Sequence, residues 1–325
     1  MSHAIRFYAT GGPDVLRWEE FDPGLPARGE VLVRQTAVGL NFLDVYDRSG
    51  LYPVGMLPSG LGREGAGVVE VVGPGVHNVK PGDRVAYVSS QPGAYAQERV
   101  LPANRLVAIP DGVSDRLAAA AMLKGLTAHY LLRKTHRVRR GDTIVVHAAA
   151  GGVGLIVVQW ARHLGAEVIA VTGNDAKAQL ARTHGATHTL ILGRDDLPSS
   201  VRALTRGRGA DVVYDSVGKD TFTMSLDCLR PRGLMVSYGN ASGPVSPFSP
   251  LELSRRGSLY LTRPTLFHYI ATRSELDRAA RELFDVIGSG VVRIEIGQTY
   301  ALQDAEQAHR DLEGRRTVGS TVLLP

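Results

Sequence analysis

Short apolar runs separated by Gly and Pro dominate the first third of the chain. The clearest are residues 31–34, 68–72 and 84–88, which are rich in β-branched side chains and bounded by turn residues. One helical pattern interrupts them, with Asn41 able to cap a helix and Gly50 able to end it. This part therefore predicts a compact, partly closed antiparallel β domain with one short helix.

The pattern changes after about residue 140, where strand-like and helix-like segments alternate. Helical spacing of apolar residues recurs in segments such as 155–164, 175–183 and 221–229. Between such segments lie six predicted strands: residues 143–147, 167–171, 189–192, 211–214, 234–238 and 258–261. Strands joined by helical crossovers form a parallel sheet, so we predict an α/β fold with a doubly wound sheet of six strands.

The last part of the chain predicts one further helix and a closing strand. The helix begins near Ser274, and its apolar face is formed by Leu276, Ala279, Ala280, Leu283 and Ile287. The strand covers residues 320–324. We expect residues 1–123 to form the first part of the β-rich domain, 124–261 the parallel-sheet domain, and 262–325 a return to the first domain.

Composition agrees with a globular protein and excludes several other classes. Of 325 residues, 44% are hydrophobic and 21% charged, which argues against disorder. The excess of 37 basic over 32 acidic residues suits an anionic partner, but the densest basic run, 133–140, follows an apolar helical stretch. A solvated helix end explains that run better than a nucleic-acid patch.

Cysteine content limits the possible disulfides and metal centres, and hydropathy bears on whether the protein spans a membrane. The single cysteine, Cys228, excludes an intrachain disulfide and a cysteine-built metal centre, and its apolar neighbours predict a packing residue. The chain begins without an apolar signal-peptide core. The most apolar window, 143–161, contains His147, Gln159 and clustered glycines, so we expect no membrane span and a cytoplasmic protein.

A glycine-rich turn joins the first predicted strand of the parallel sheet to its helix. Gly151 would let the backbone approach a pyrophosphate, and Gly154 would let helix and strand pack closely. Ala149 stands where the first glycine of a dinucleotide-binding fingerprint is expected. The strand before the turn and the apolar helix after it nevertheless favour dinucleotide binding over a purely structural turn.

The end of the second predicted strand bears on the choice of cofactor. An NAD enzyme places Asp or Glu there to bind the ribose hydroxyls, whereas this chain has Gly173, with Lys177 in the following turn. A missing carboxylate and a nearby cation favour the extra phosphate of NADPH. Asp175 is the alternative, because it could turn toward a free ribose.

Zinc ligands are missing from the places where related folds carry them. In zinc alcohol dehydrogenases a histidine ligand lies in a segment similar to residues 62–67, and here Arg63 stands in its place. The first domain contains no cysteine, and no H-E-x-x-H pattern occurs. We therefore predict no metal and a substrate whose acceptor group needs little polarisation.

Recognisable motifs lie along the whole chain, at residues 41–46 with 49–53, 61–67, 123–127, 148–154, 214–218 and 233–240. They resemble those of the quinone oxidoreductases, the zinc-free, zeta-crystallin-like branch of the medium-chain dehydrogenase/reductase superfamily. The chain is most similar to the bacterial NADPH:quinone reductases. The resemblance implies a GroES-like catalytic domain joined to a Rossmann domain, NADPH in the cleft, and a homodimer formed largely through the Rossmann domains.

The resemblance also implies which residues meet the cofactor. Near the nicotinamide half it implies Asn41, Asp44 and Thr127, and at the pyrophosphate Gly151, Gly152 and Val153. At the 2′-phosphate it implies Gly173, Asn174 and Lys177. Ser216 is implied near the adenosine half, and Asn240 and Arg315 around the nicotinamide end and the phosphates.

One position departs from the family pattern. A tyrosine often binds the 2′-phosphate from the end of the third Rossmann strand, but here Leu192 stands there, followed by Gly193 and Arg194. Either Arg194 supplies a stronger anion contact, or the preference for NADPH is weaker in this chain.

The expected reaction is transfer of a hydride, or of single electrons, from NADPH to a quinone without a metal. Asn41, Tyr46 and Tyr52 are the catalytic candidates on the substrate side, and packing of the cleft wall is an equal alternative for the two tyrosines. A second candidate function is NADPH-dependent reduction of activated C=C bonds in enones or enoyl thioesters. RNA binding is a third, but the chain lacks a basic tract or an aromatic platform for it.

Overall fold

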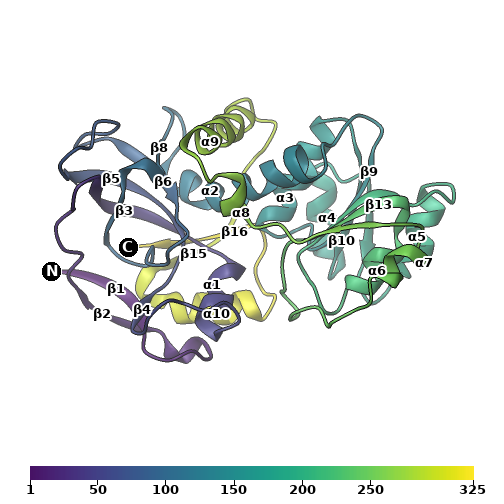
Figure 1. The fold of residues 1–325 in the computed structure, drawn as a ribbon, viewed down its shortest axis with the longest axis horizontal. Coiled ribbons are helices and arrows are strands. Elements are labelled where there is room, and N and C mark those ends of the chain that lie inside the picture. Colours follow the sequence, from purple (N-terminus) through teal and green to yellow (C-terminus); the bar gives the residue numbers. More distant parts are fainter. The chain divides into compact units, whose positions relative to one another are not determined.

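The computed structural model describes residues 1–325, which fold as two compact units (Figure 1). The first unit comprises Met1–Leu126, Ala271–Phe284 and Ile294–Pro325, and the second comprises Thr127–Ile270 and Asp285–Arg293. The chain passes from the first to the second unit inside helix α2, three residues after the boundary expected from the sequence. It returns at Ala271, beyond the last strand of the parallel sheet.

The first unit is built mainly of strands. Its strands are β1 (Ser2–Phe7), β2 (Arg17–Phe21), β3 (Glu30–Leu40), β4 (Ser59–Gly60), β5 (Glu64–Val72), β6 (Arg84–Val88), β7 (Glu98–Pro102), β8 (Leu106–Ala108), β15 (Ile296–Ala301) and β16 (Ser320–Leu324). Its helices, of which α2 and α9 also reach into the second unit, are α1 (Phe42–Ser49), α2 (Asp115–Tyr130), α9 (Arg273–Gly288) and α10 (Ala305–Glu313).

A seven-stranded sheet forms the body of this unit. Its order is β15-β16-β3-β5-β6-β8, and β7 pairs with the first half of β3. All pairings are antiparallel, as predicted, except that β15 runs parallel to β16. A core of buried aliphatic and aromatic side chains, including Phe7, Leu40 and Tyr95, packs within the unit.

Helix α1 forms where the sequence predicts it, and its ends show why. Asn41 occupies the N-cap position, and the Asp44 carboxylate accepts the backbone N–H of Asn41 at 2.8 Å, which is one half of a capping box. At the other end, Gly50 adopts a left-handed conformation with φ of 80°, which glycine adopts without a steric penalty. These local signals place the polar side chains of α1 at the end of β3.

The second unit alternates strands and helices. Its strands are β9 (Thr143–Val146), β10 (Glu167–Thr172), β11 (His188–Ile191), β12 (Ala210–Asp215), β13 (Leu229–Ser237) and β14 (Tyr260–Thr262). Its helices are α3 (Gly152–His163), α4 (Asp175–Thr183), α5 (Leu197–Leu204), α6 (Phe222–Asp227), α7 (Leu251–Arg255) and α8 (Leu266–Tyr269).

The six strands form one sheet in the order β11-β10-β9-β12-β13-β14, and every pairing is parallel. Numbered along the chain, this order is 3-2-1-4-5-6, that of the Rossmann fold, so the predicted fold class is confirmed. Side chains on both faces are buried: Val145 and Val213 pack with α5 and α6, while Ile144 and Val146 point to the opposite face.

No helix of the chain is both long enough and apolar enough to cross a membrane.

Candidate active site

Buried polar residues gather around the N-terminus of α1 in the first unit. Asn41 is 6% exposed, and its Nδ2 donates to Oε1 of Glu64 at 2.7 Å. Glu64, the first residue of β5, is completely buried and also accepts from Lys124 Nζ at 2.7 Å and from the backbone N–H of Leu123 at 2.6 Å. Glu64 therefore binds the nitrogen side of the Asn41 amide and sets its orientation.

A second set of contacts runs from Asp44 to the C-terminal helix α10. The Tyr95 hydroxyl donates to Asp44 Oδ2 at 3.0 Å, and His309 Nε2 lies 3.2 Å from the same hydroxyl. On its other side, His309 Nδ1 faces Nη1 of Arg48 at 3.0 Å. A guanidinium can only donate, so Nδ1 accepts and the ring proton is on Nε2, from which it is donated to Tyr95.

The electrostatics of this set follow from its burial. Desolvation, with a smaller contribution from the nearby Asp47, raises the pKa of Asp44 to about 7 against the opposing hydrogen bond from the Asn41 N–H. Asp44 Oδ1 is buried and has no hydrogen-bond partner. Burial, together with the charge of Arg48, lowers the pKa of His309 to about 3, so this imidazole is neutral at pH 7.

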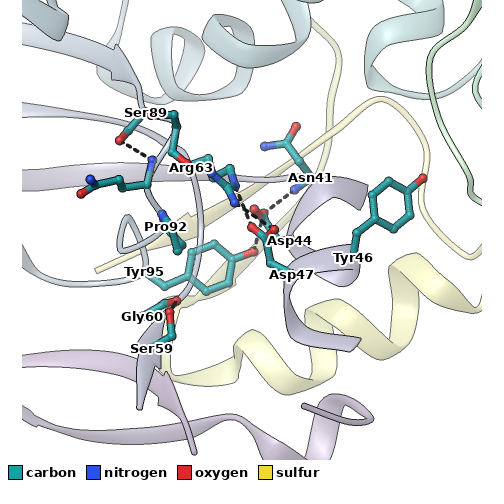
Figure 2. Close-up of polar contacts among 12 residues, drawn as sticks. Asn41, Asp44, Tyr46, Asp47, Ser59, Gly60, Arg63, Ser89, Pro92 and Tyr95 are labelled. Carbon is teal, nitrogen blue, oxygen red and sulfur yellow. Dashed lines mark hydrogen bonds and ion pairs between the residues drawn. The ribbon is translucent and has the colours of Figure 1, made fainter. Parts of the chain in front are cut away.

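The position that carries a zinc-binding histidine in zinc alcohol dehydrogenases holds a buried ion pair here. Arg63 meets Asp47 through two hydrogen bonds, with Nε 2.6 Å from Oδ2 and Nη2 2.9 Å from Oδ1 (Figure 2). Arg63 also donates to the Ser90 carbonyl. No three side chains of His, Cys, Asp or Glu are grouped to hold a metal ion. The residues present do not fit a zinc ion.

The predicted substrate-side tyrosines lie on α1 and just after it. Figure 2 shows Tyr46 projecting from α1, with its ring turned away from the cluster formed by Asp44, Asp47 and Arg63. The ring of Tyr46 makes an edge contact with Tyr52, with 5.1 Å between centroids. Arg315 comes from another segment, in the exposed turn after α10, with φ of 58°.

In the second unit, nearly all the predicted cofactor residues follow the carboxyl ends of the parallel strands. The turn after β9 holds Gly151, the N-cap of α3, with Gly152 and Val153 in the first turn of that helix. No side chain caps α3, so its first N–H groups are available to an anion. A Cβ at Gly154 would lie 2.4 Å from the Ala148 carbonyl oxygen, which shows why helix and turn approach so closely.

The ends of β10 and β11 bring together the residues expected at the 2′-phosphate. A Cβ at Gly173 would meet no atom within 4 Å, so the space beside it is open. Asn174 caps α4 by accepting the backbone N–H of Lys177 at 2.9 Å. Arg194, in the loop after β11, pairs with Asp175 through Nη1 at 3.1 Å. Arg194 and the open space at Gly173, where an NAD enzyme carries its acidic ribose ligand, fit a phosphorylated dinucleotide, and Lys177 lies in the first turn of α4.

The remaining predicted residues lie on the loops after β12 and β13 and on α2. The carbonyl of Ser216 accepts the N–H of Ala241, which ties these two loops together. In the amide orientation that satisfies both of its polar atoms, Asn240 accepts from Arg263 Nη2 at 3.2 Å. Thr127, on α2, is 6% exposed.

Several polar residues of these sites could not be found from the sequence. Glu64 lies 60 positions from Lys124, and Arg48 lies 261 positions from His309, so no local motif links them. The only local sign of these residues in the sequence was a charged side chain inside an apolar or glycine-rich segment.

Cys228 is fully buried, and its burial raises its pKa to about 12, which confirms it as a packing residue.

Comparison with known families and proteins agrees with this arrangement. Residues 27–111 match the alcohol dehydrogenase GroES-like domain, and residues 152–285 match the family described as zinc-binding dehydrogenase. A quinone oxidoreductase of Pseudomonas aeruginosa is 54% identical over 325 residues, covering 100% of both chains. A 2-haloacrylate reductase of Burkholderia is 48% identical, covering 100% of this chain and 99% of the relative.

The structure of Escherichia coli quinone oxidoreductase in complex with NADPH superposes with a TM-score of 0.98. It is 49% identical, and the match covers 99% of this chain and 100% of that chain. Full-length identity of about one half and a shared fold lead to one conclusion: the chain belongs to the quinone oxidoreductase family of the medium-chain dehydrogenase/reductase superfamily.

Proposed function

We propose that the protein is an NADPH-dependent quinone reductase that works without a metal ion. The observation that carries the proposal is the gathering of the glycine turn, the open space at Gly173 and the cations Lys177 and Arg194 at the carboxyl edge of one parallel sheet. Relatives that are half identical over the full length and named quinone oxidoreductase support the choice of acceptor.

Different loops of the parallel-sheet unit are assigned to different parts of NADPH. The helix N-terminus at Gly151, Gly152 and Val153 receives the pyrophosphate, because its N–H groups carry partial positive charge. The 2′-phosphate is assigned to the neighbouring loops, and the adenosine to the loop after β12. These residues are Gly173, Asn174, Lys177 and Arg194 for the phosphate and Ser216 for the adenosine.

The nicotinamide half is assigned to polar residues that the fold holds in one orientation. Asn41 is oriented by Glu64, and Asp44 by Tyr95. We also assign Thr127, Asn240 and Arg315 to this half of the cofactor, as the family resemblance implies. NADPH, when bound, supplies the hydride.

Reduction of a quinone to a hydroquinone takes that hydride and one proton. The hydroquinone anion is a weak base, so the proton can come from solvent. Tyr46 and Tyr52 are proposed to contact the quinone, with their ring edges packed on each other and their hydroxyls able to donate to its oxygen.

The proposal is tested by steady-state rates with several acceptors. With NADPH, a benzoquinone should be reduced with a kcat/KM at least about tenfold above that for an enone or for 2-chloroacrylate. Incubation with EDTA should leave the rate unchanged. Oxidation of NADPH without any turnover of quinones would contradict the assignment, and so would activity that EDTA removes and zinc restores.

A second candidate is reduction of activated C=C bonds, favoured by the relative named 2-haloacrylate reductase at 48% identity. It needs the same cofactor and a proton donor at the substrate, for which Tyr52 is the candidate. A higher kcat/KM for 2-chloroacrylate than for benzoquinone, lost in Tyr52→Phe, would establish this function in place of quinone reduction.

We also propose a cytoplasmic homodimer that associates through the parallel-sheet unit. Strand β14 is an edge strand, paired only with β13, and Tyr260 on it is 62% exposed. Sedimentation equilibrium should give twice the chain mass, and Tyr260→Asp should shift the measured mass toward that of the monomer.

We expect no RNA affinity that persists at about 0.2 M salt.

A further inference from the structure

A buried histidine stands immediately before the glycine-rich turn. His147 follows β9 and is fully buried, although neither the fold nor the assigned cofactor contacts require an ionisable side chain there. Its Nε2 lies 2.9 Å from the hydroxyl of Ser225 on α6, and its Nδ1 is buried without a hydrogen-bond partner. An unpartnered ring nitrogen costs stability that an apolar side chain would not, so packing alone does not explain the residue.

The direction of each hydrogen bond follows from the chemistry of Asp215. The Ser225 hydroxyl lies 2.8 Å from Asp215 Oδ2, and a carboxylate only accepts, so Ser225 donates to it. Ser225 must therefore accept from His147, which places the ring proton on Nε2. Burial lowers the pKa of His147 despite the opposing charge of Asp215, so the imidazole is neutral.

Asp215 distributes its other contacts to the loop that follows β12. Its Oδ1 accepts the backbone N–H groups of Val217 at 2.8 Å and Gly218 at 3.1 Å. Its Oδ2 accepts the Thr221 hydroxyl at 2.7 Å as well as that of Ser225. Four donors fill the acceptor sites of the carboxylate, and two of them hold the loop that carries Ser216.

These contacts join the loop after β9 to the loop after β12, at the point where the strand order of the sheet reverses. β9 and β12 are neighbours, and the strand order runs outward from them on both sides. The backbone N–H of His147 extends the hydrogen bonding between β9 and β12 by donating to the Tyr214 carbonyl at 3.0 Å. Beyond His147, the backbone at Ala148 takes a positive φ of 49° to enter the turn. The side-chain link His147–Ser225–Asp215 therefore lies between the pyrophosphate turn and the Ser216 loop.

We propose that His147 is a positioning residue for the cofactor: through Ser225 and Asp215 it sets the spacing between the glycine turn and the Ser216 loop, and thereby the affinity for NADPH. This inference rests on the proposed function, because it assigns pyrophosphate to one loop and adenosine to the other. It predicts that breaking the link weakens binding of a ligand that spans both loops.

The test compares variants that break the link with one that removes a different bond to the same carboxylate. Ser225→Ala and His147→Met break the link, and His147→Gln keeps an N–H donor near the Nε2 position. Thr221→Val is the matched control, since it removes a hydroxyl donor from Asp215 without touching His147. Dissociation constants for NADPH, measured by fluorescence titration, and unfolding midpoints in urea are recorded for each variant.

We expect Ser225→Ala and His147→Met to raise the Kd for NADPH by about tenfold, and His147→Gln to restore it to within about threefold of wild type. Thr221→Val should lower the unfolding midpoint about as much as Ser225→Ala does. It should change the Kd for NADPH by less than about threefold. Adenosine 2′-monophosphate lacks the pyrophosphate and cannot span the loops, so its affinity should stay within about twofold in all variants.

The proposal is overturned if both link variants bind NADPH as wild type does, or if they lose no more affinity than Thr221→Val. It is also overturned if His147→Gln behaves like His147→Met. Failure of the wild-type protein to bind NADPH at all would instead refute the proposed function, and this inference with it.

Discussion

Arg194 and Asp175 form an ion pair that connects the ends of two neighbouring strands. The Arg194 guanidinium donates to both carboxylate oxygens, at 3.1 and 3.2 Å, from the loop after β11 to the first residue of α4. Their side chains are 58% and 82% exposed, so the pair contributes about 1 kcal/mol or less. A phosphate with two negative charges can therefore replace Asp175 at little cost.

This exchange predicts a change in cofactor preference. Arg194→Ala should raise the KM for NADPH by about tenfold and leave that for NADH nearly unchanged, because only NADPH carries the 2′-phosphate. Asp175→Asn should act in the opposite direction and lower the KM for NADPH by a few fold. Lys177→Ala is the comparison variant, with an expected effect like that of Arg194→Ala. Equal losses for both cofactors would show that these side chains do not bind the phosphate.

We expect substitution by alanine to destabilise the protein at Gly154 but to have almost no effect at Gly173. A Cβ at Gly154 would lie 2.4 Å from the Ala148 oxygen and 2.7 Å from the Ala149 Cα, and these backbone atoms cannot move aside cheaply. Gly154→Ala should therefore reduce the free energy of unfolding by about 1–3 kcal/mol. Gly173→Ala, where the space is open, should change it by less than about 0.5 kcal/mol. Urea denaturation without cofactor measures both, and equal effects would contradict the packing argument.

Lys124 and Glu64 form a buried ion pair, so we expect the effects of substituting them on the free energy of unfolding to be strongly coupled. Lys124→Met leaves the Glu64 carboxylate buried with only Asn41 and a backbone N–H as donors, and should reduce the free energy of unfolding by about 3–5 kcal/mol. Adding Glu64→Gln removes the unpaired charge, so the double variant should be more stable than Lys124→Met alone. Additive losses in this double-mutant cycle would show that the pair is not coupled.

Asp44 predicts a dependence of stability on pH with a definite sign. Its folded pKa of about 7 lies above the unfolded value of 3.8, so between these values the folded state binds more protons than the unfolded state. Its contribution is therefore fully present below about pH 4 and is lost as pH rises through 7. A difference of about three pKa units corresponds to about 4 kcal/mol.

Comparison with Asp44→Asn isolates this group, because asparagine does not titrate. The stability of the wild type relative to the variant should fall by up to about 4 kcal/mol between pH 4 and pH 8. His309, whose pKa is lowered, acts in the opposite direction below pH 6.5 but is common to both proteins and cancels. A constant difference across this range would mean that Asp44 titrates as an ordinary exposed carboxylate does.

Local signals in the sequence determined the elements around the cofactor site. The alternation of apolar strands with amphipathic helices predicted the six-stranded parallel sheet, since parallel strands require crossovers. Asn41 and Gly50 marked the ends of α1 because capping acts within a few residues. The glycine turn and Gly173 were informative for the same reason: the backbone geometry that they permit is a property of the residue itself.

Edge strands were harder to predict. Strand β15 alternates between partly buried and exposed positions and contains Gly297, so it has no continuous apolar run, and its parallel pairing with β16 follows from the return of the chain. Strands β1, β2 and β4 form a small separate sheet, in which β1 buries Ala4, Ile5 and Phe7 whereas β2 and β4 have no buried position. Hydrogen bonding to β1, not a pattern of buried side chains, makes β2 and β4 strands.

Only the tertiary structure decided which polar groups meet. Glu64 holds Lys124 across 60 residues, His309 meets Arg48 across 261, and His147 reaches Asp215 through Ser225. Hydrophobic periodicity says which face of an element is buried, but not which charged residue inside that face finds a partner. That choice depends on the packing of distant segments, because a buried polar group is stable only where the fold brings it a hydrogen-bonding partner.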